Sequence, residues 1–334
     1  MPSQKIGSKS FDGVRLYLQK VFMKYLVTGA TGFVGSWLVR RLVADGHSVA
    51  VVTRRASDLW RIRPWLSLLT QIDGDLCRIS ESSPAILSFA PETVLHLAWT
   101  GGNSSKFLND AAQVYANIPG SMELMRIAAQ AGARTFINFG SCVEYGQYSI
   151  PVRESDPVLP MNLYGRAKYT VEELGMALAP VLDFRFASMR LFWAYGPADD
   201  EARLMPSLIR KMLSGQRHPM TAGEQLWDYI YIEDVIEAVV RVANTPSATG
   251  IFNLGSGKPE KLGVVAGQIA ALVGEQSLLG LGDIPYGVHQ VMHLEADVTK
   301  LRTLTGWEPR VDLPSGLLRT VEWYKKGSRE LPPL

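Results

Sequence analysis

The chain has 334 residues and a mass of 36.8 kDa, with 47% hydrophobic and 20% charged residues, so it can bury a sizeable core. Lys and Arg total 34 against 32 Asp and Glu, and this net charge of +2 excludes the bulk basic field of a nucleic-acid-binding protein. Two cysteines and five histidines are too few for a disulfide framework or a Cys-based zinc site, and we predict no metal centre.

Residues 1–22 precede the first strand-like run and carry charges throughout, without the continuous apolar run of a signal peptide. No later stretch approaches the roughly 20 apolar residues that span a bilayer. We therefore expect a cytoplasmic protein with no membrane partner. We predict that 1–22 form an N-terminal extension, and Met23 is a candidate true start. The alternative is that apolar residues such as Val14, Leu16 and Leu18 pack on the domain surface.

From Lys24 onward, apolar strands alternate with longer helical patterns. Several strands are near-continuous runs of Val, Ile, Leu and Phe, as expected for a parallel sheet that is covered on both faces. The alternation predicts an α/β fold with a doubly wound parallel sheet of Rossmann type. The expected strands are 24–28, 48–53, 93–97, 134–140 and 184–191, and the expected helices are 33–44, 107–131, 163–179, 205–213 and 232–243.

The first expected strand runs directly into a glycine-rich loop with Gly-x-x-Gly-x-x-Gly spacing, and an apolar helical pattern follows it. In this context the glycines permit a tight turn, a close approach to a pyrophosphate and close packing of the helix on the strand. The helix N-terminus supplies free N–H groups for the phosphates. The alternative is an ordinary strand–helix turn. We predict that a dinucleotide cofactor contacts Gly29, Thr31, Gly32, Phe33, Val34 and Gly35.

The second expected strand ends in Thr53-Arg54-Arg55. An acidic residue at this place holds the ribose 2′-hydroxyl of NAD, whereas an arginine accommodates the 2′-phosphate of NADP. We therefore predict that Arg54 and Arg55 favour NADP(H) over NAD(H), the alternative being a solvated basic turn. Asp75 and Leu76 follow a third strand and are candidates for contacting the adenine, or they form a surface turn.

A Tyr and a Lys stand four residues apart in Tyr164-Gly165-Arg166-Ala167-Lys168, so they share one face of the predicted helix. An ammonium group near a phenol lowers the pKa of the phenol and makes it a usable general acid or base. Ser141 directly follows the strand 134–140, at the carboxyl end of the strand, where a hydroxyl faces the ligand crevice of such a sheet. These three residues are candidates for a catalytic group, although a Tyr-x-x-x-Lys pair is also common on surfaces.

Beyond Asp199 the pattern loosens into short pieces that are punctuated by Pro and Gly. This predicts a smaller, discontinuous C-terminal lobe that carries the substrate. We place the dinucleotide-binding domain at 23–200, with 229–254 returning to it, and the substrate lobe at 201–228 and 255–334.

The sequence resembles the extended short-chain dehydrogenases/reductases that modify nucleotide sugars, and the resemblance covers Met23 to about Tyr324. Many ordered matches make it specific. They are Thr28–Gly35, Val94-Leu95-His96-Leu97-Ala98, Asn117, Gly140-Ser141 with Tyr145-Gly146, Tyr164 with Lys168, Arg190–Pro197, Asp228–Asp234, Phe252–Gly257, and Asp297 to Lys300 followed by Gly306-Trp307-Glu308-Pro309.

This resemblance implies NAD or NADP as cofactor and Ser141, Tyr164 and Lys168 as the catalytic triad. It also implies that Leu97, Ala98 and Lys168 contact the cofactor and that Asn117 lies near the nicotinamide. Members of the family form homodimers, which suggests a four-helix contact made by the helices 107–131 and 163–179.

Three functions follow from the resemblance. Cys142 and Val143 replace the acid pair of the sugar 4,6-dehydratases, so water elimination is disfavoured. We predict NADPH-dependent reduction of a nucleotide-linked 4-keto sugar with Tyr164 as proton donor, because Gly-Ser-x-x-Glu-Tyr-Gly and residues 54–63 are similar to the CDP-abequose and CDP-paratose synthases. The alternatives are a nucleotide-sugar 4-epimerase with tightly bound NAD(P) and a catalytically silent, NADP-binding regulatory protein.

The chain departs from the family pattern where it meets the substrate. Trp193 and Trp227 stand where many relatives have Asn and Arg, which puts the grip on a diphosphate in doubt. Arg203 is a candidate replacement cation, and its alternative is a solvated helix face. Cys142 and Glu144, beside Ser141, complete the predicted substrate residues, although a packing Cys and a backbone-capping Glu are the simpler interpretations.

Overall fold

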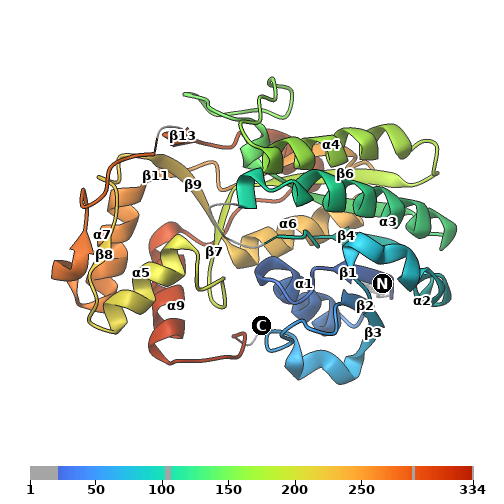
Figure 1. The fold of residues 1–334 in the computed structure, drawn as a ribbon, viewed down its shortest axis with the longest axis horizontal. Coiled ribbons are helices and arrows are strands. Elements are labelled where there is room, and N and C mark those ends of the chain that lie inside the picture. The colour runs from blue at the N-terminus through green and yellow to red at the C-terminus, as the bar shows by residue number, and fades with distance from the viewer. Residues whose placement is uncertain (1–21, 102–106, 288–289, 333–334) are drawn as a thin grey trace, which may run out of the picture.

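A computed structural model of the chain describes residues 22–101, 107–287 and 290–332. Its main sheet contains β1 Lys24–Thr28, β2 Ser48–Thr53, β3 Leu69–Asp73, β4 Thr93–His96, β5 Thr135–Ser141, β6 Arg185–Leu191 and β10 Gly250–Leu254. Their order is β10-β6-β5-β4-β1-β2-β3, and every neighbouring pair is parallel (Figure 1). The predicted doubly wound α/β sheet is confirmed.

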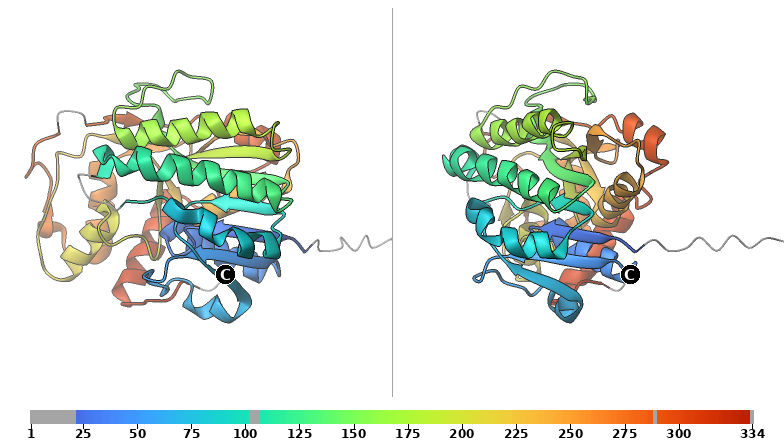
Figure 2. Two further views of the ribbon diagram at one scale, coloured as in Figure 1. Left: turned by 45° about the vertical axis from the view of Figure 1, so that its right-hand side comes forward. Right: turned by 90° about the vertical axis from the view of Figure 1, so that its right-hand side faces the viewer.

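Helices cover both faces of this sheet. They are α1 Phe33–Ala44, α2 Ser83–Phe89, α3 Ile118–Gln130, α4 Leu163–Leu178, α6 Ile232–Asn244 and α8 Thr299–Thr305. α2, α3 and α4 lie together on one face, and α1 and α6 lie on the other (Figure 2). Alternate residues of β1 serve the two faces, because Tyr25 and Val27 join the core beneath α1 and α6 whereas Leu26 joins the core beneath α3 and α4.

The strand order reverses between β1 and β4, so this position is the topological switch point at which ligands of open α/β sheets bind. The carboxyl ends of β1, β4 and β5 lead into three predicted site segments: the glycine loop, Leu97-Ala98, and Ser141. The sheet topology therefore brings segments more than 100 residues apart in sequence to one edge of the molecule.

A second group of elements stands beside the main sheet. A small sheet runs β11-β9-β13, with β7 pairing the later residues of β9, and α5, α7 and α9 pack against one another next to it (Figure 1). The elements are β7 Trp193–Tyr195, β9 Leu226–Tyr231, β11 Pro259–Lys261, β13 His293–Leu294, α5 Leu204–Leu213, α7 Leu262–Val273 and α9 Leu313–Lys325, and the two-residue strands β8 His218–Pro219 and β12 Leu279–Gly280 pair with each other. The domain boundaries drawn from the sequence stay a prediction.

The expected helix 107–131 is the main error in the predicted elements. The structure divides it into a 3-10 turn at Phe107–Asn109, a π-helical turn at Gln113–Asn117 and α3 from Ile118. Pro119 lies at the first turn of α3, where its missing N–H costs nothing, so a regular helix begins there rather than continuing through. The helices α7 and α9 were not predicted. α7 is apolar on nearly every side and so shows no helical period.

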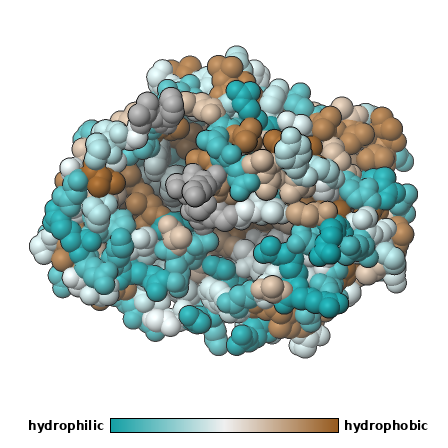
Figure 3. All heavy atoms as spheres, in the orientation of Figure 1, coloured by the Kyte–Doolittle hydropathy of each residue, from teal (hydrophilic) through white to brown (hydrophobic). Residues whose placement is uncertain are grey.

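Within the described part of the chain, no helix combines the length and the apolar character needed to cross a bilayer. The face in Figure 3 is mostly hydrophilic, and apolar atoms gather at its right-hand side, over the ends of α3 and α4. On α4 the exposed apolar side chains include Leu174 and Met176, and Val181 follows the helix. The homodimer contact through these helices stays a prediction.

Candidate active site

The glycine loop forms a cradle that excludes side chains. Gly29 has a φ of +71°, and a Cβ there would lie 2.7 Å from the backbone nitrogen of Ala98. A Cβ on Gly35 would lie 2.2 Å from the carbonyl oxygen of Gly29, so α1 can approach β1 this closely only through glycine. No side chain caps the N-terminus of α1 at Gly32, which leaves its first N–H groups available to a phosphate. These residues fit a dinucleotide pyrophosphate.

A cleft next to this loop contains many of the predicted cofactor residues. Its lining includes Gly29, Thr31, Gly32, Arg54, Asp75, Leu76, Leu97 and Ala98. Phe33, Val34 and Gly35 belong instead to α1, where Phe33 is buried in the core and Gly35 packs on the loop. Asp75 accepts a hydrogen bond from the Cys77 backbone N–H at 3.0 Å, which fixes the turn after β3.

Arg55 does not lie where the predicted NADP preference needs it. Its exposed guanidinium Nε lies 2.5 Å from Asp73 Oδ2, at the end of the adjacent strand β3, and it does not line the cleft. Arg54 alone of the pair reaches the lining. The sequence showed two adjacent arginines, but both lie in the turn after β2, and Arg55 meets an acidic partner there.

The hydroxyls and the amine of the predicted triad meet at the carboxyl end of β5. Asn162 caps α4 by accepting the Gly165 N–H at 2.8 Å, which sets Tyr164 in the first turn. Burial raises the pKa of the Tyr164 hydroxyl to about 12, and the neighbouring Ser141 hydroxyl opposes that rise. The structure therefore brings Ser141 and Tyr164 together.

Lys168 is held behind these hydroxyls. Its Nζ donates to the Phe139 carbonyl oxygen at 2.7 Å and lies 3.8 Å from the centre of the Trp99 ring but 5.9 Å from that of Tyr164. Burial lowers the pKa of Lys168 to about 7, and Glu144 opposes that effect. In the protein alone, burial lowers the pKa of Lys168 and so disfavours its charged form, and burial also raises the pKa of Tyr164. The expectation that Lys168 lowers the pKa of Tyr164 is therefore not met in the protein alone.

Trp99 connects the cofactor cleft to the triad, and the sequence reading missed it. Its ring lines the cleft and stands edge-on to Tyr164 at 6.0 Å between centroids, and its Nε1 donates to Gln113 Oε1 at 2.6 Å. The signal available in the sequence was its position directly after Leu97-Ala98, at the end of β4. A large side chain there can fill the space between cleft and triad.

Asn117 fixes the loop that follows Trp99. Its Oδ1 accepts the Thr100 N–H at 2.6 Å and its Nδ2 donates to the Thr100 carbonyl oxygen at 3.1 Å. The side chain is fully buried, and these bonds to Thr100 occupy its amide. The structure thus gives Asn117 a role in shaping the cleft, and its place near the nicotinamide stays a prediction.

His96 is structural, as the sequence reading favoured. The Ser121 hydroxyl donates to the Asn117 carbonyl oxygen at 2.7 Å, so His96 Nε2 must donate to that hydroxyl at 2.9 Å. His96 Nδ1 then accepts from Thr28 Oγ1 at 2.8 Å, and Thr28 accepts the Ala98 N–H at 3.1 Å. Burial lowers the His96 pKa to about 3, so the ring is neutral and ties β1 to β4 beneath the cleft.

Two of the predicted substrate residues are buried, which is at odds with direct substrate contact. Glu144 is completely buried and accepts the Ser141 N–H at 2.6 Å, so the backbone-capping interpretation is the correct one. Cys142 is also buried, and desolvation raises the pKa of its thiol to about 12, so the side chain is a neutral thiol at neutral pH.

The other three stand together at the neighbouring lobe. Trp193 and Trp227 stack with 4.6 Å between centroids, and Trp227 donates to the Val291 carbonyl oxygen at 2.9 Å. The Arg203 guanidinium lies 5.6 Å from the centre of the Trp193 ring and pairs with Asp199 at 3.0 Å. Trp193 packs against Trp227 instead of offering both faces to a base. Burial raises the pKa of Tyr164, and the charge of Arg203 is among the smaller effects that oppose that rise.

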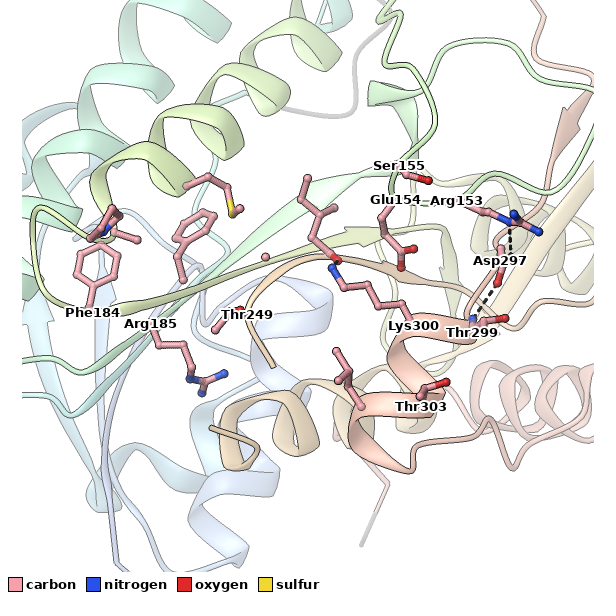
Figure 4. Close-up of a pocket in the computed structure, with 17 residues that line it drawn as sticks. Arg153, Glu154, Ser155, Phe184, Arg185, Thr249, Asp297, Thr299, Lys300 and Thr303 are labelled. Atoms are coloured by element: carbon pink, nitrogen blue, oxygen red, sulfur yellow. Dashed lines mark hydrogen bonds and ion pairs between the residues drawn. The ribbon is translucent and has the colours of Figure 1, made fainter. Parts of the chain in front are cut away.

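A larger hollow, of about 1120 Å³, lies elsewhere, at the starts of β6 and β10 (Figure 4). Glu154 and Lys300 point into it. They serve the edge strand β10: Lys300 Nζ donates to the Ile251 carbonyl oxygen at 2.6 Å, and Glu154 accepts the Asn253 N–H at 2.8 Å. None of the predicted site residues lines this hollow, so the smaller cleft at the switch point is the candidate active site. No group of three His, Cys, Asp or Glu side chains among the described residues is arranged to hold a metal ion.

Comparisons with known proteins agree with this architecture. Residues 25–255 match the NAD dependent epimerase/dehydratase family, and this range is more than half of the chain. The chain therefore belongs to that family, which contains nucleotide-sugar-modifying enzymes of the extended short-chain dehydrogenase/reductase type. The expected preference for NADP has no support from the family description or from Arg55.

Three similar proteins illustrate the relationship. The chain is 28% identical to a UDP-glucose 4-epimerase of Mycolicibacterium smegmatis (92% of this chain, 100% of the relative) and 26% identical to a probable UDP-glucuronate 4-epimerase of Rhizobium meliloti (92% and 98%). The crystal structure of UDP-glucose 4-epimerase with UDP-glucose from Thermotoga maritima matches with a TM-score of 0.84 and 26% identity, covering 91% of this chain and 99% of that one.

Proposed function

We propose that the chain is an NAD-dependent nucleotide-sugar 4-epimerase that acts on a UDP-linked hexose or hexuronic acid. The observation that supports this most is the meeting of Ser141, Tyr164 and Lys168 at the carboxyl end of β5, next to the glycine-loop cleft. The two relatives described above carry 4-epimerase names and share nearly their full length with this chain. This replaces reduction of a 4-keto sugar as the first candidate.

In this proposal Tyr164 carries the proton. Ser141 orients the C4 oxygen of the sugar through its hydroxyl, and Tyr164 takes the C4 hydroxyl proton on oxidation and returns it on reduction. When bound, NAD supplies a reversible hydride acceptor, and the positive charge of its oxidised ring favours the phenolate form of a nearby tyrosine. That charge opposes the burial that raises the pKa of Tyr164 in the protein alone.

The residues around the triad suit oxidoreduction at C4 better than water elimination. Cys142 has a raised thiol pKa, and Val143 has no titratable group, so neither replaces the acid pair of a dehydratase. We propose Arg203, directly before α5, as the cation that meets a substrate phosphate, because its charge acts on Tyr164. NADPH-dependent reduction of a nucleotide-linked 4-keto sugar remains the second candidate, on the ground that Arg54 lines the cleft.

The test is conversion of UDP-glucose and UDP-glucuronic acid with added NAD, followed by separation of the C4 epimers. A parallel reaction with NADPH and a 4-keto sugar nucleotide tests reduction. We expect epimer formation by the wild type, a loss of roughly 10² to 10⁴ in rate for Tyr164→Phe, and near-normal rates for the control Tyr169→Phe on the same helix. NADPH consumption without epimer formation would overturn the proposal in favour of the reductase.

A further inference from the structure

A cluster of four buried charged side chains joins Lys168 of the triad to three groups behind it. They are Glu144 after β5, Lys168 and Glu172 on α4, and Arg190 on β6. Arg190 Nε lies 3.3 Å from Glu144 Oε2, and its Nη2 pairs with Glu172. With all four ionised, the cluster holds two positive and two negative charges and is neutral. Losing one charge leaves another buried without a counter-charge, which is costly in a protein interior.

The sequence Gly140-Ser141-x-x-Glu144 builds this arrangement. A Cβ on Gly140 would lie 2.7 Å from Glu144 Oε1 and 3.3 Å from Arg190 Cγ, so glycine makes room for both. Gly140 and Arg190 are also register partners in the paired strands β5 and β6. The Arg190 guanidinium rests 4.5 Å from the centre of the Tyr145 ring, and Tyr145 donates to Asn253 Oδ1 at 2.7 Å. The carboxylate is thus held from several elements at once.

Glu144 contacts the triad in two ways. Its Oε1 accepts the Ser141 N–H at 2.6 Å, while Ser141 Oγ accepts the Val143 N–H at 3.3 Å, a reciprocal capping box that fixes the catalytic serine. Its charge also interacts with the buried Lys168, and Glu144 is the charged neighbour that favours the protonated amine. Besides Lys168, Glu144 interacts electrostatically with Arg190 from β6, with Glu172, Tyr164 and Tyr169 from α4, and with Cys142.

We propose that Glu144 is a positioning residue of this site. One of its carboxylate oxygens anchors the Ser141 backbone, and its charge keeps Lys168 protonated in the working enzyme. The inference rests on the proposed function only in taking Ser141 and Lys168 as the working groups. It explains a fully buried acid in a segment where the sequence reading expected a substrate contact.

The test compares two substitutions that each remove one carboxylate from Arg190. Glu144→Gln keeps an acceptor for the Ser141 N–H but removes the charge beside Lys168, whereas Glu172→Gln removes a charge from the far side of Arg190. NADH binding is measured by fluorescence as a function of pH, and epimer formation is measured alongside. We expect the alkaline fall in NADH affinity to move to lower pH by about one unit in Glu144→Gln, because a nearby opposite charge shifts a pKa by one unit or more.

Glu172→Gln serves as the matched control, with the opposite expectation. Glu172 raises the pKa of Glu144, so its removal favours the Glu144 carboxylate and leaves the fall in NADH affinity unchanged or at higher pH. Equal shifts in both variants, or no shift in Glu144→Gln, would overturn the proposal. If no sugar is converted, the proposed function fails while the NADH titration still decides the role of Glu144.

A measurement on the wild type covers the case in which Glu144→Gln does not fold or NADH does not bind. The Ser141 amide in a protein labelled with ¹⁵N-serine is assigned by its absence in Ser141→Ala. Its shift should titrate with Glu144, whose pKa is raised by burial, and Lys168→Met should move this inflection to higher pH because the charge of Lys168 lowers that pKa. A flat Ser141 titration, or one that Lys168→Met leaves in place, contradicts the coupling.

Discussion

Replacing Gly35 by alanine tests the glycine cradle more directly than any other change. Gly35 lies in the first turn of α1, and its added Cβ would meet three backbone atoms: the Gly29 oxygen at 2.2 Å, the Gly29 carbonyl carbon at 2.8 Å and the Ala30 Cα at 3.0 Å. Ordinary contacts of this kind begin at 3.4 Å. Because all three atoms belong to the backbone, no side-chain rotation relieves the overlap, and α1 must move away from β1.

The expected magnitude follows from two opposed effects. Alanine favours a helix over glycine by about 1 kcal/mol. Overpacking costs about 1–3 kcal/mol, and an overlap with backbone belongs at the upper end of that range. The net loss in the free energy of unfolding is therefore about 2 kcal/mol. The entropy of unfolding of a chain of 334 residues is about 0.7 kcal/mol/K, so the midpoint of thermal unfolding should fall by about 3 °C.

Urea unfolding and NADH titration measure the two consequences. Gly35→Ala should lower both stability and NADH affinity, since the N-terminus of α1 moves with the loop. Gly267→Ala is the matched control, because Gly267 lies within α7 and an added Cβ there meets nothing within 4 Å. That variant should gain up to about 1 kcal/mol. If Gly35→Ala were as stable as Gly267→Ala, the close approach of α1 to the loop would be refuted.

Three further changes have defined outcomes. Below pH 6.5 the unfolded chain protonates His96, whereas the folded chain does not until about pH 3, so stability falls as pH falls through this window. Between pH 7 and 5, His96→Gln should lose about 2 kcal/mol less than the wild type in urea unfolding. Iodoacetamide should label the exposed Cys77 and spare the buried Cys142 until the protein unfolds, as mass spectrometry will show. Asp228 accepts four hydrogen bonds, two of them from Ser256, so Asp228→Asn should lower the unfolding free energy by about 3 kcal/mol, and a loss below about 1 kcal/mol would contradict this.

The features that the sequence predicted well depend on neighbours in the chain. The bounds of the helix 33–44 match α1, because a glycine turn and an apolar period define both of its ends. Tyr164 and Lys168 share a helix face wherever that helix packs, and Ser141 ends a strand whose apolar run is plain in the sequence. The prediction of one helix over 107–131 failed because it too relied on the local pattern. The helical period continues through a segment where the backbone instead forms the π-helical turn Gln113–Asn117.

The features that the sequence could not predict depend on distant partners. Residue types show which side chains carry charge, but not what each charge meets. Arg55 meets Asp73 across two strands, and Glu144 meets Arg190, which lies 46 positions further along the chain. A paired surface arginine is a weak cofactor ligand, and a buried, paired glutamate cannot reach a substrate, so both interpretations changed once the partners were known. The predicted role of Arg203 toward a substrate phosphate stays a prediction, although its partner Asp199 lies only four residues away in the sequence.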